Sequence, residues 1–256
     1  SRASVACALT LITSKQPTRY HSVIGTGDET EKASIRMKPR YPLMQTFDQL
    51  PDRIPIYRLE NALLPGGELP VELSRPGDLT LFLHALRSDQ LIGMVQPQDD
   101  YSAVDSHTTG CACRIRQNRE RKDGRINIML TGLCRYRIVE KEQQSDGYPI
   151  ARVDWRGFEK DFENERVDAV VIEKFKHDLR HYFERFQMQV DWEVLEKLPI
   201  EQVVNNLVLI VNLDRDSKQL LLEASTVAER LGLFSALLQG KQAPIRAASS
   251  QRGYVN

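Results

Sequence analysis

Two histidines at helical spacing are the residues whose types most directly suggest metal chemistry. His177 and His181 are four residues apart and Glu173 precedes them by one turn, so a helix would carry all three on one side. A zinc site needs a further ligand or a bound water and a dry setting. The charged neighbours Lys174 and Arg180 instead place the pair on a solvated helix face. We therefore predict no metal site and no cofactor.

Two of the four cysteines form a second candidate cluster. Cys111 and Cys113 have only one residue between them, whereas thiol pairs that bind zinc are spaced by two or more. Strand alternation would put both on the same face as Ile115, and a free cysteine packs as a small hydrophobic residue. We predict that both thiols belong to the core.

Short motifs of phosphate binding and nucleophilic catalysis are missing from the sequence. It contains neither Gly-x4-Gly-Lys-Ser/Thr nor Gly-x-Ser-x-Gly. The pair Gly66-Gly67 does not have the spacing of either motif and is typical of a turn. We predict no catalytic residues. A hydrolase stays an alternative, because catalytic triads assemble from residues far apart in sequence.

A basic cluster surrounds the tip of a predicted hairpin at residues 114–125. It contains Arg114, Arg116, Arg119, Arg121, Lys122 and Arg125, with Glu120 and Asp123 as its acids. The cluster could bind an acidic ligand or a nucleic-acid backbone. It could also be a solvated ribbon whose charges discourage edge-to-edge aggregation. No aromatic residues are interleaved for base stacking, which disfavours nucleic acid.

Alternating strands position this cluster. Asp123-Gly124 lies between two alternating runs, which is a strong hairpin signal. The alternation puts Cys134, Tyr136 and Ile138 on one face and Arg135 and Arg137 on the other. Further strands are expected at 69–73, 91–95 and 150–155, and a short helix is expected to begin at Pro76. We predict that the hairpin strands and the strand at 150–155 form an antiparallel meander with one buried face, in a barrel or curled sheet.

Helical periodicity replaces alternation after about residue 158. One apolar stripe contains Val171, Phe175, Leu179, Tyr182, Phe183 and Phe186. Pro199 begins a second helix, Asp216 is expected to cap a third, and Thr226 with Glu229 forms a capping box for a fourth. Strands followed by helices indicate the α+β class.

Composition limits the partners. The chain has 256 residues, 27% of them charged, and a formal net charge of zero, which argues against a protein that coats nucleic acid or anionic membranes. No apolar run reaches the ~18–20 residues that span a bilayer, and we expect a cytoplasmic protein. We predict that translation begins at Met37 or Met44, that residues 1–43 are a disordered or spurious extension, and that residues 241–256 form a mobile tail.

Several segments together resemble one family, the substrate-binding N-terminal domain of Lon-type proteases, and are most like its stand-alone bacterial members. They occur in the family's order: Ile54-Pro-Ile-Tyr57, Leu64-Pro-Gly-Gly67, Leu91-Ile-Gly-Met-Val-Gln-Pro97, residues 110–138, Val204-Asn-Asn-Leu207 and residues 218–230. One loop departs from the family, where Ser74-Arg-Pro-Gly-Asp78 replaces the common Phe-Glu-Pro-Arg-Tyr.

The resemblance implies a β-rich, PUA-like pseudobarrel at residues 44–158 and a C-terminal helical bundle at residues 159–240. It also implies a non-catalytic module that binds unfolded or extended polypeptide and works with a protease or chaperone. The substrate-binding residues it suggests are Pro65, Gly67, Pro76, Met94 and Tyr136. Tyr136 also alternates with Cys134 and Ile138, so a purely core role stays open for it.

Overall fold

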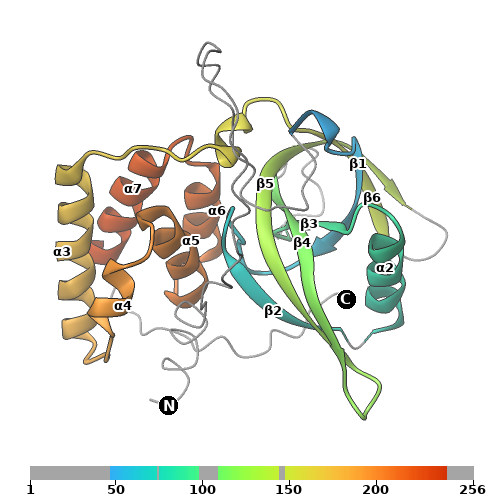
Figure 1. Cartoon of the computed structure of the whole chain (residues 1–256), viewed down its shortest axis with the longest axis horizontal. Helices are drawn as coiled ribbons and strands as arrows, with labels where there is room; N and C mark the ends of the chain where they lie inside the picture. The colour runs from blue at the N-terminus through green and yellow to red at the C-terminus, as the bar shows by residue number, and fades with distance from the viewer. Residues whose placement is uncertain (1–46, 74, 98–108, 144–147, 241–256) are drawn as a thin grey trace, which may run out of the picture.

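The computed structural model describes residues 47–73, 75–97, 109–143 and 148–240. The predictions for residues 1–43 and 241–256 fall outside these ranges. A β-rich half is followed by a helical half (Figure 1), which confirms the α+β class. Short 3-10 helices, η1 (Phe47–Gln49) and η2 (Glu159–Phe162), lie before β1 and after β6. The strands are β1 (Arg53–Arg58), β2 (Glu68–Leu73), β3 (Leu91–Val95), β4 (Thr109–Glu120), β5 (Ile126–Gln143) and β6 (Pro149–Asp154).

The sheet is closed by its longest strand. Its strand order is β2-β5-β4-β3-β1-β6, and β6 also pairs with β5. The 18 residues of β5 let it pair with β2 near its start, with β4 up to Arg137 and with β6 from Arg137 to its end. The predicted antiparallel meander is confirmed, because β4 pairs antiparallel with β5 and β5 pairs antiparallel with β6. Outside the meander, β1 and β3 are parallel. Parallel neighbours require a crossover connection, and here β2 and α2 (Pro76–Arg87) provide it.

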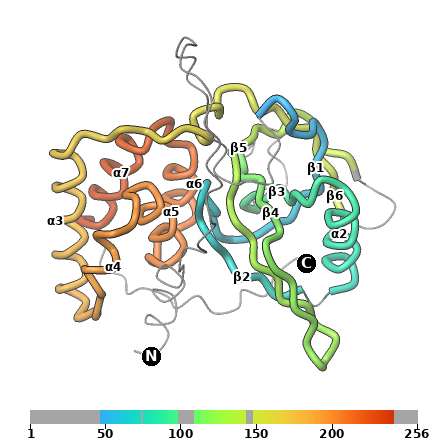
Figure 2. The backbone as a smooth tube through the Cα atoms, in the orientation of Figure 1, coloured from blue at the N-terminus to red at the C-terminus, as the bar shows by residue number. Residues whose placement is uncertain are grey.

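The β4–β5 hairpin turns as the Asp-Gly signal predicted. The Arg121 N–H donates to the Arg125 carbonyl at 2.8 Å, and the Gly124 N–H donates to the Arg121 carbonyl at 3.0 Å. Gly124 has φ of +80°, which suits the glycine that closes a three-residue hairpin loop. A bulge separates Ile115 from Gln117 in β4. The hairpin tip projects away from the rest of the molecule (Figure 2).

Both faces of β4 are buried near its start, which corrects the expectation of a single buried face. Cys111 and Cys113 pack into one hydrophobic core, as predicted, while Ala112 between them packs into a second core. The first core extends into the helical half, and the second is built around Tyr136. Burial raises the pKa of the Cys113 thiol well above its usual range, so this thiol stays protonated.

The helical half contains α3 (Ala169–Arg185), α4 (Trp192–Glu196), α5 (Ile200–Ile210), α6 (Arg215–Glu223) and α7 (Val227–Gly240). The stripe predicted for α3 is confirmed: Phe175 and Leu179 are buried, and His177 and His181 are exposed. The structure also adds the short helix α4, which the sequence patterns did not indicate. Within the described ranges, no helix has the length and apolar character that crossing a membrane requires.

Aspartate and threonine side chains cap the starts of α3, α4, α6 and α7. Asp168 and Asp191 cap α3 and α4. Asp214, and not the predicted Asp216, caps α6, because its carboxylate accepts from the Ser217 N–H at 2.7 Å. The Thr226 hydroxyl accepts from the Glu229 N–H at 3.0 Å, which confirms that half of the capping box.

Candidate functional site

Two of the residues suggested for substrate binding lie in the core of the β-rich half. Tyr136 is fully buried, and its hydroxyl donates to the Met94 carbonyl at 3.1 Å. Added Cβ atoms at Gly93 and Gly110 would lie 2.7 and 2.5 Å from the Tyr136 oxygen, so these glycines make room for the ring. Met94 is buried as well. The structure brings the pair together, but inside the protein, and their binding role stays a prediction.

Pro65 and Gly67 lie where the β-rich half meets the helical half. The Pro65 carbonyl accepts from the Asn205 side chain at 2.6 Å, which ties the loop to α5. The Gly67 carbonyl accepts from the Gly132 N–H at 2.9 Å, and the Gly66 N–H donates back to the Gly132 carbonyl at 2.8 Å. Two segments that carry the family resemblance, at residues 64–67 and 204–207, therefore contact each other.

Pro76 is not part of this junction. It is exposed at the first residue of α2, which lies at the opposite side of the molecule from α5 (Figure 1). The five suggested residues thus fall into three separate places: one buried pair, one junction loop and one exposed helix start. They do not form a single site.

Close packing at Gly132 gives a direct test of this junction. A Cβ there would lie 2.0 Å from the Leu64 carbonyl oxygen, a backbone atom that cannot rotate away. We expect Gly132→Ala to lower the free energy of unfolding by about 1–3 kcal/mol, as overpacking does. Gly232→Ala is the matched control, because its Cβ would meet nothing within 4 Å inside α7. It should stabilise the protein by about 0.5–1 kcal/mol. Urea denaturation of both variants measures the difference.

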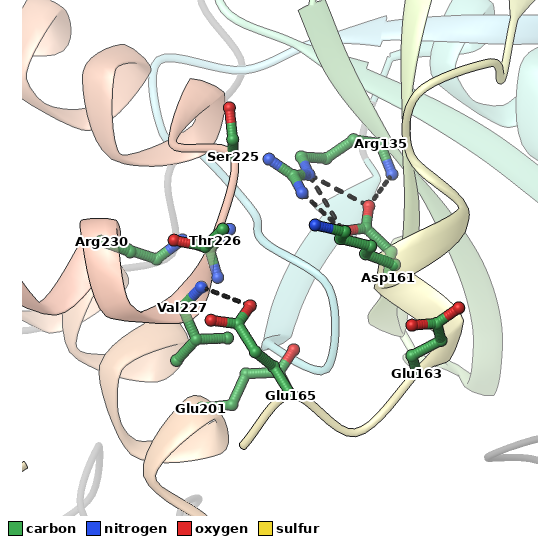
Figure 3. Close-up of a pocket in the computed structure, with 10 residues that line it drawn as sticks. Arg135, Asp161, Glu163, Glu165, Glu201, Ser225, Thr226, Val227 and Arg230 are labelled. Carbon is green, nitrogen blue, oxygen red and sulfur yellow. Dashed lines mark hydrogen bonds and ion pairs between the residues drawn. The ribbon is translucent and has the colours of Figure 1, made fainter. Parts of the chain in front are cut away.

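A buried ion pair, absent from the sequence predictions, lies at the same junction (Figure 3). The Arg135 side chain is 3% exposed and that of Asp161 is 5% exposed. The Arg135 guanidinium donates to both Asp161 oxygens, at 2.7 to 3.1 Å, and to the Leu222 carbonyl at 3.2 Å. The alternation had placed Arg135 on the polar face beside Arg137. That prediction is wrong for Arg135, because the helical half covers this face.

A second arginine extends the network. Arg230 of α7 is 2% exposed and donates to the Leu221 carbonyl at 3.0 Å and to the Asn205 carboxamide oxygen at 2.9 Å. Burial, with a smaller contribution from the nearby Arg135, lowers the pKa of Arg230 to about 10. The Glu165 carboxylate accepts from the Val227 N–H at 2.8 Å at the start of α7.

The space inside this network fits no ligand larger than water. The cavity among these side chains measures about 10 Å³, which is about the volume that one water molecule needs. Its charged lining consists of Arg135, Lys160, Asp161, Glu163, Glu165, Glu201 and Arg230. We interpret the junction as a structural connection between the two halves. Among the described residues, no His, Cys, Asp and Glu side chains are grouped as a metal site requires.

The helical half carries a larger, mainly apolar groove. It measures about 220 Å³ and lies between α3, α4 and the start of α5. Its apolar lining consists of Ile172, Phe175, Leu179, Trp192, Leu195, Leu198, Ile200 and Val203, and its charged lining of Lys176 and Glu196. A closed apolar cavity of about 150 Å³ holds a benzene ring. This groove is therefore large enough for one bulky apolar side chain.

Contacts between aromatic rings, and between one arginine and a ring, form part of the groove wall. Trp192 packs edge-on against Phe183 at 6.0 Å between ring centroids, and the Arg180 guanidinium lies 5.2 Å from the Trp192 ring. Phe175 forms part of the floor and contacts Phe234 of α7 at 5.9 Å. The apolar stripe of α3 indicated this helix face, but only the fold shows that its buried residues Phe175 and Leu179 border a groove.

The basic hairpin is partly neutralised by neighbouring acids. Arg121 and Arg125 contact the two Glu72 oxygens, at 3.1 and 2.8 Å, and Arg125 also pairs with Asp123. Hydrogen bonds from Arg125 hold the pKa of Asp123 below its usual value. Arg119 and Lys122 are exposed near the tip. The hairpin keeps a basic character, and the sequence-based choice between ligand binding and a solvated ribbon stays open.

Comparisons with known proteins agree on one family. Residues 53–240 match the family described as ATP-dependent protease La (LON) substrate-binding domain. Two solved structures have the same fold at 18% sequence identity. The match to the Lon N-terminal domain protein from Xanthomonas campestris has a TM-score of 0.55. It covers 72% of this chain and 97% of the chain in that structure. The match to the N-terminal domain of Mycobacterium avium complex Lon protease has a TM-score of 0.58. It covers 74% of this chain and 100% of the chain in that structure.

Curated relatives are much longer proteins. Lon protease 2 of Myxococcus xanthus is 33% identical over 130 residues, which are 49% of this chain and 16% of the relative. Lon protease of Xanthomonas oryzae pv. oryzae is 25% identical over 212 residues, which are 78% of this chain and 24% of the relative. The chain thus spans a quarter or less of either relative.

Proposed function

Because the chain belongs to the family of LON substrate-binding domains, we propose that it binds extended or unfolded polypeptides, without chemical action on them, through the groove between α3, α4 and α5. The observation that carries the proposal is the groove itself, an apolar surface on a domain whose family is described by substrate binding. A protease or chaperone would then receive the captured chain.

The groove chemistry supports this choice. Burying a Leu or Phe side chain is worth about 1.5–3 kcal/mol, enough for weak and reversible capture of a chain that exposes such residues. A folded protein keeps these side chains inside and offers fewer of them. Lys176 and Glu196 carry opposite charges, so the lining favours neither acidic nor basic chains strongly.

Substituting the groove wall tests the proposal. We expect Ile172→Asp to weaken binding to a permanently unfolded protein at least tenfold, because a carboxylate in the groove must lose water when a ligand side chain enters. Val170→Asp is the matched control. Val170 lies two residues away on α3, is 76% exposed and does not line the groove, so its substitution should leave the affinity unchanged. Fluorescence anisotropy without ATP measures both, with the folded form of the same ligand as a negative control.

Several outcomes would contradict the groove assignment. Equal affinities for Ile172→Asp and the unchanged chain would place binding elsewhere, provided circular dichroism shows that the variant is folded. If that variant does not fold, Ile172→Ser provides a milder test of the same position. A purified chain that hydrolyses peptide or ester substrates would contradict the non-catalytic part of the proposal.

A further inference from the structure

The three strands β2, β5 and β4 form an arm with two outer edges, and the β2 edge is blocked. The Gly132 N–H donates to the Gly67 carbonyl, directly before β2. Backbone groups alternate in direction along antiparallel strands, so those of Leu69, Val71 and Leu73 pair with β5. The backbone groups of the residues between them point outward. The outward Glu68 N–H donates to the Asn206 side chain at 3.2 Å. Pro70, the next outward residue, has no N–H. An added strand would find few donors there.

The β4 edge has a different backbone. The Arg121 N–H donates to the Arg125 carbonyl, directly before β5, so the same alternation directs the backbone groups of Asn118 and Glu120 outward. The Ile115 N–H, which also points outward, donates to the Gln90 carbonyl at 3.3 Å, and pairing with β3 ends at Arg114. Beyond this point, no described strand pairs with the outer edge of β4. Residues 116–120 are exposed on the projecting hairpin.

We propose that the outer edge of β4 at residues 117–120 accepts an extended acidic segment of a polypeptide as an additional strand. The Asn118 and Glu120 backbone would pair with it, as in other cases of strand addition. The exposed Arg119 and Lys122 would attract its carboxylates. The same basic residues would repel the hairpin of a second copy, which favours a foreign acidic strand over self-association. This surface is separate from the groove and does not depend on the function proposed for it.

A peptide of twelve alternating glutamate and valine residues, labelled with fluorescein, is the probe. We expect it to bind the full chain, and we expect a peptide with lysine in place of glutamate not to bind. Asn118→Pro should weaken binding about tenfold or more, because it removes an outward donor and leaves the bonds to β5 in place. The native Pro70 at an outward position of β2 indicates that such an edge tolerates proline. Ile172→Asp, the groove variant, should bind this peptide normally.

Backbone methylation of the peptide separates strand addition from simple charge attraction. One peptide is N-methylated at its valines and another at its glutamates, and at least one should bind tenfold more weakly. If both methylated peptides bind the unchanged chain as tightly as the unmethylated peptide, the proposal is overturned, and it is also overturned if the acidic peptide does not bind. If Asn118→Pro does not fold, Arg119→Glu tests the charge, with a similar loss expected. Single-stranded DNA that binds Asn118→Pro and the unchanged chain equally well and displaces the peptide would assign the hairpin to phosphate binding instead.

Discussion

Replacing Asp161 by asparagine is expected to lower the free energy of unfolding by about 3–5 kcal/mol, because it leaves a buried guanidinium without its counter-charge. The Arg135 side chain is shielded from bulk solvent, since it is 3% exposed and is held by the Leu222 and Ala224 carbonyls. Arg230, a second buried cation, also contacts the Ala224 carbonyl and would add repulsion. Denaturation in urea, followed by circular dichroism, measures the loss.

A surface pair provides the matched control. Asp154 and Arg156 also form an aspartate–arginine pair, at 2.8 Å, but the Arg156 side chain is 88% exposed. Solvent screens such pairs, so Asp154→Asn should change stability little. If Asp161→Asn and Asp154→Asn lower the free energy of unfolding by similar amounts, burial is not the reason that the Arg135–Asp161 pair matters for stability. Trp155 and Trp192, one in each half, allow fluorescence to report whether the halves still unfold together.

Local features of the fold could be predicted from the sequence because their determinants lie close together in the chain. The hairpin follows from Asp123-Gly124 and its flanking alternation, and the start of α7 follows from Thr226 and Glu229. The buried side of α3 follows from its apolar stripe. In each case the relevant contacts span few residues, so turn chemistry and periodicity are sufficient.

The junction and the groove could not be predicted, since distant segments make them. Strand alternation distinguishes two faces of β5 but does not indicate that α6 and η2 cover the face that bears Arg135. The bond between Asn205 and Pro65 joins residues 140 positions apart. The groove is lined from α3, α4 and α5, and α4 itself lacks a long periodic pattern. Only tertiary packing brings these parts together.

Because sequence alternation does not show tertiary packing, it also left open whether Tyr136 is a binding residue or a core residue. We expect Tyr136→Ala to lower the free energy of unfolding by about 3–5 kcal/mol, the range for removing a buried aromatic ring. The ring fills space left by Gly93 and Gly110 and packs edge-on against Trp155 at 5.9 Å. Burial raises the pKa of the hydroxyl well above its usual range, so it stays a donor to Met94.

A second substitution separates the ring from its hydroxyl. Tyr136→Phe keeps the packing and loses one hydrogen bond, so a decrease of about 1 kcal/mol is expected, and Trp155 fluorescence should follow both unfolding transitions. If the residue is only core, either variant binds unfolded protein normally at temperatures where it is folded. A folded Tyr136→Ala variant of nearly unchanged stability that binds tenfold more weakly would reverse this interpretation. It would move the binding surface from the helical groove to the β-rich half.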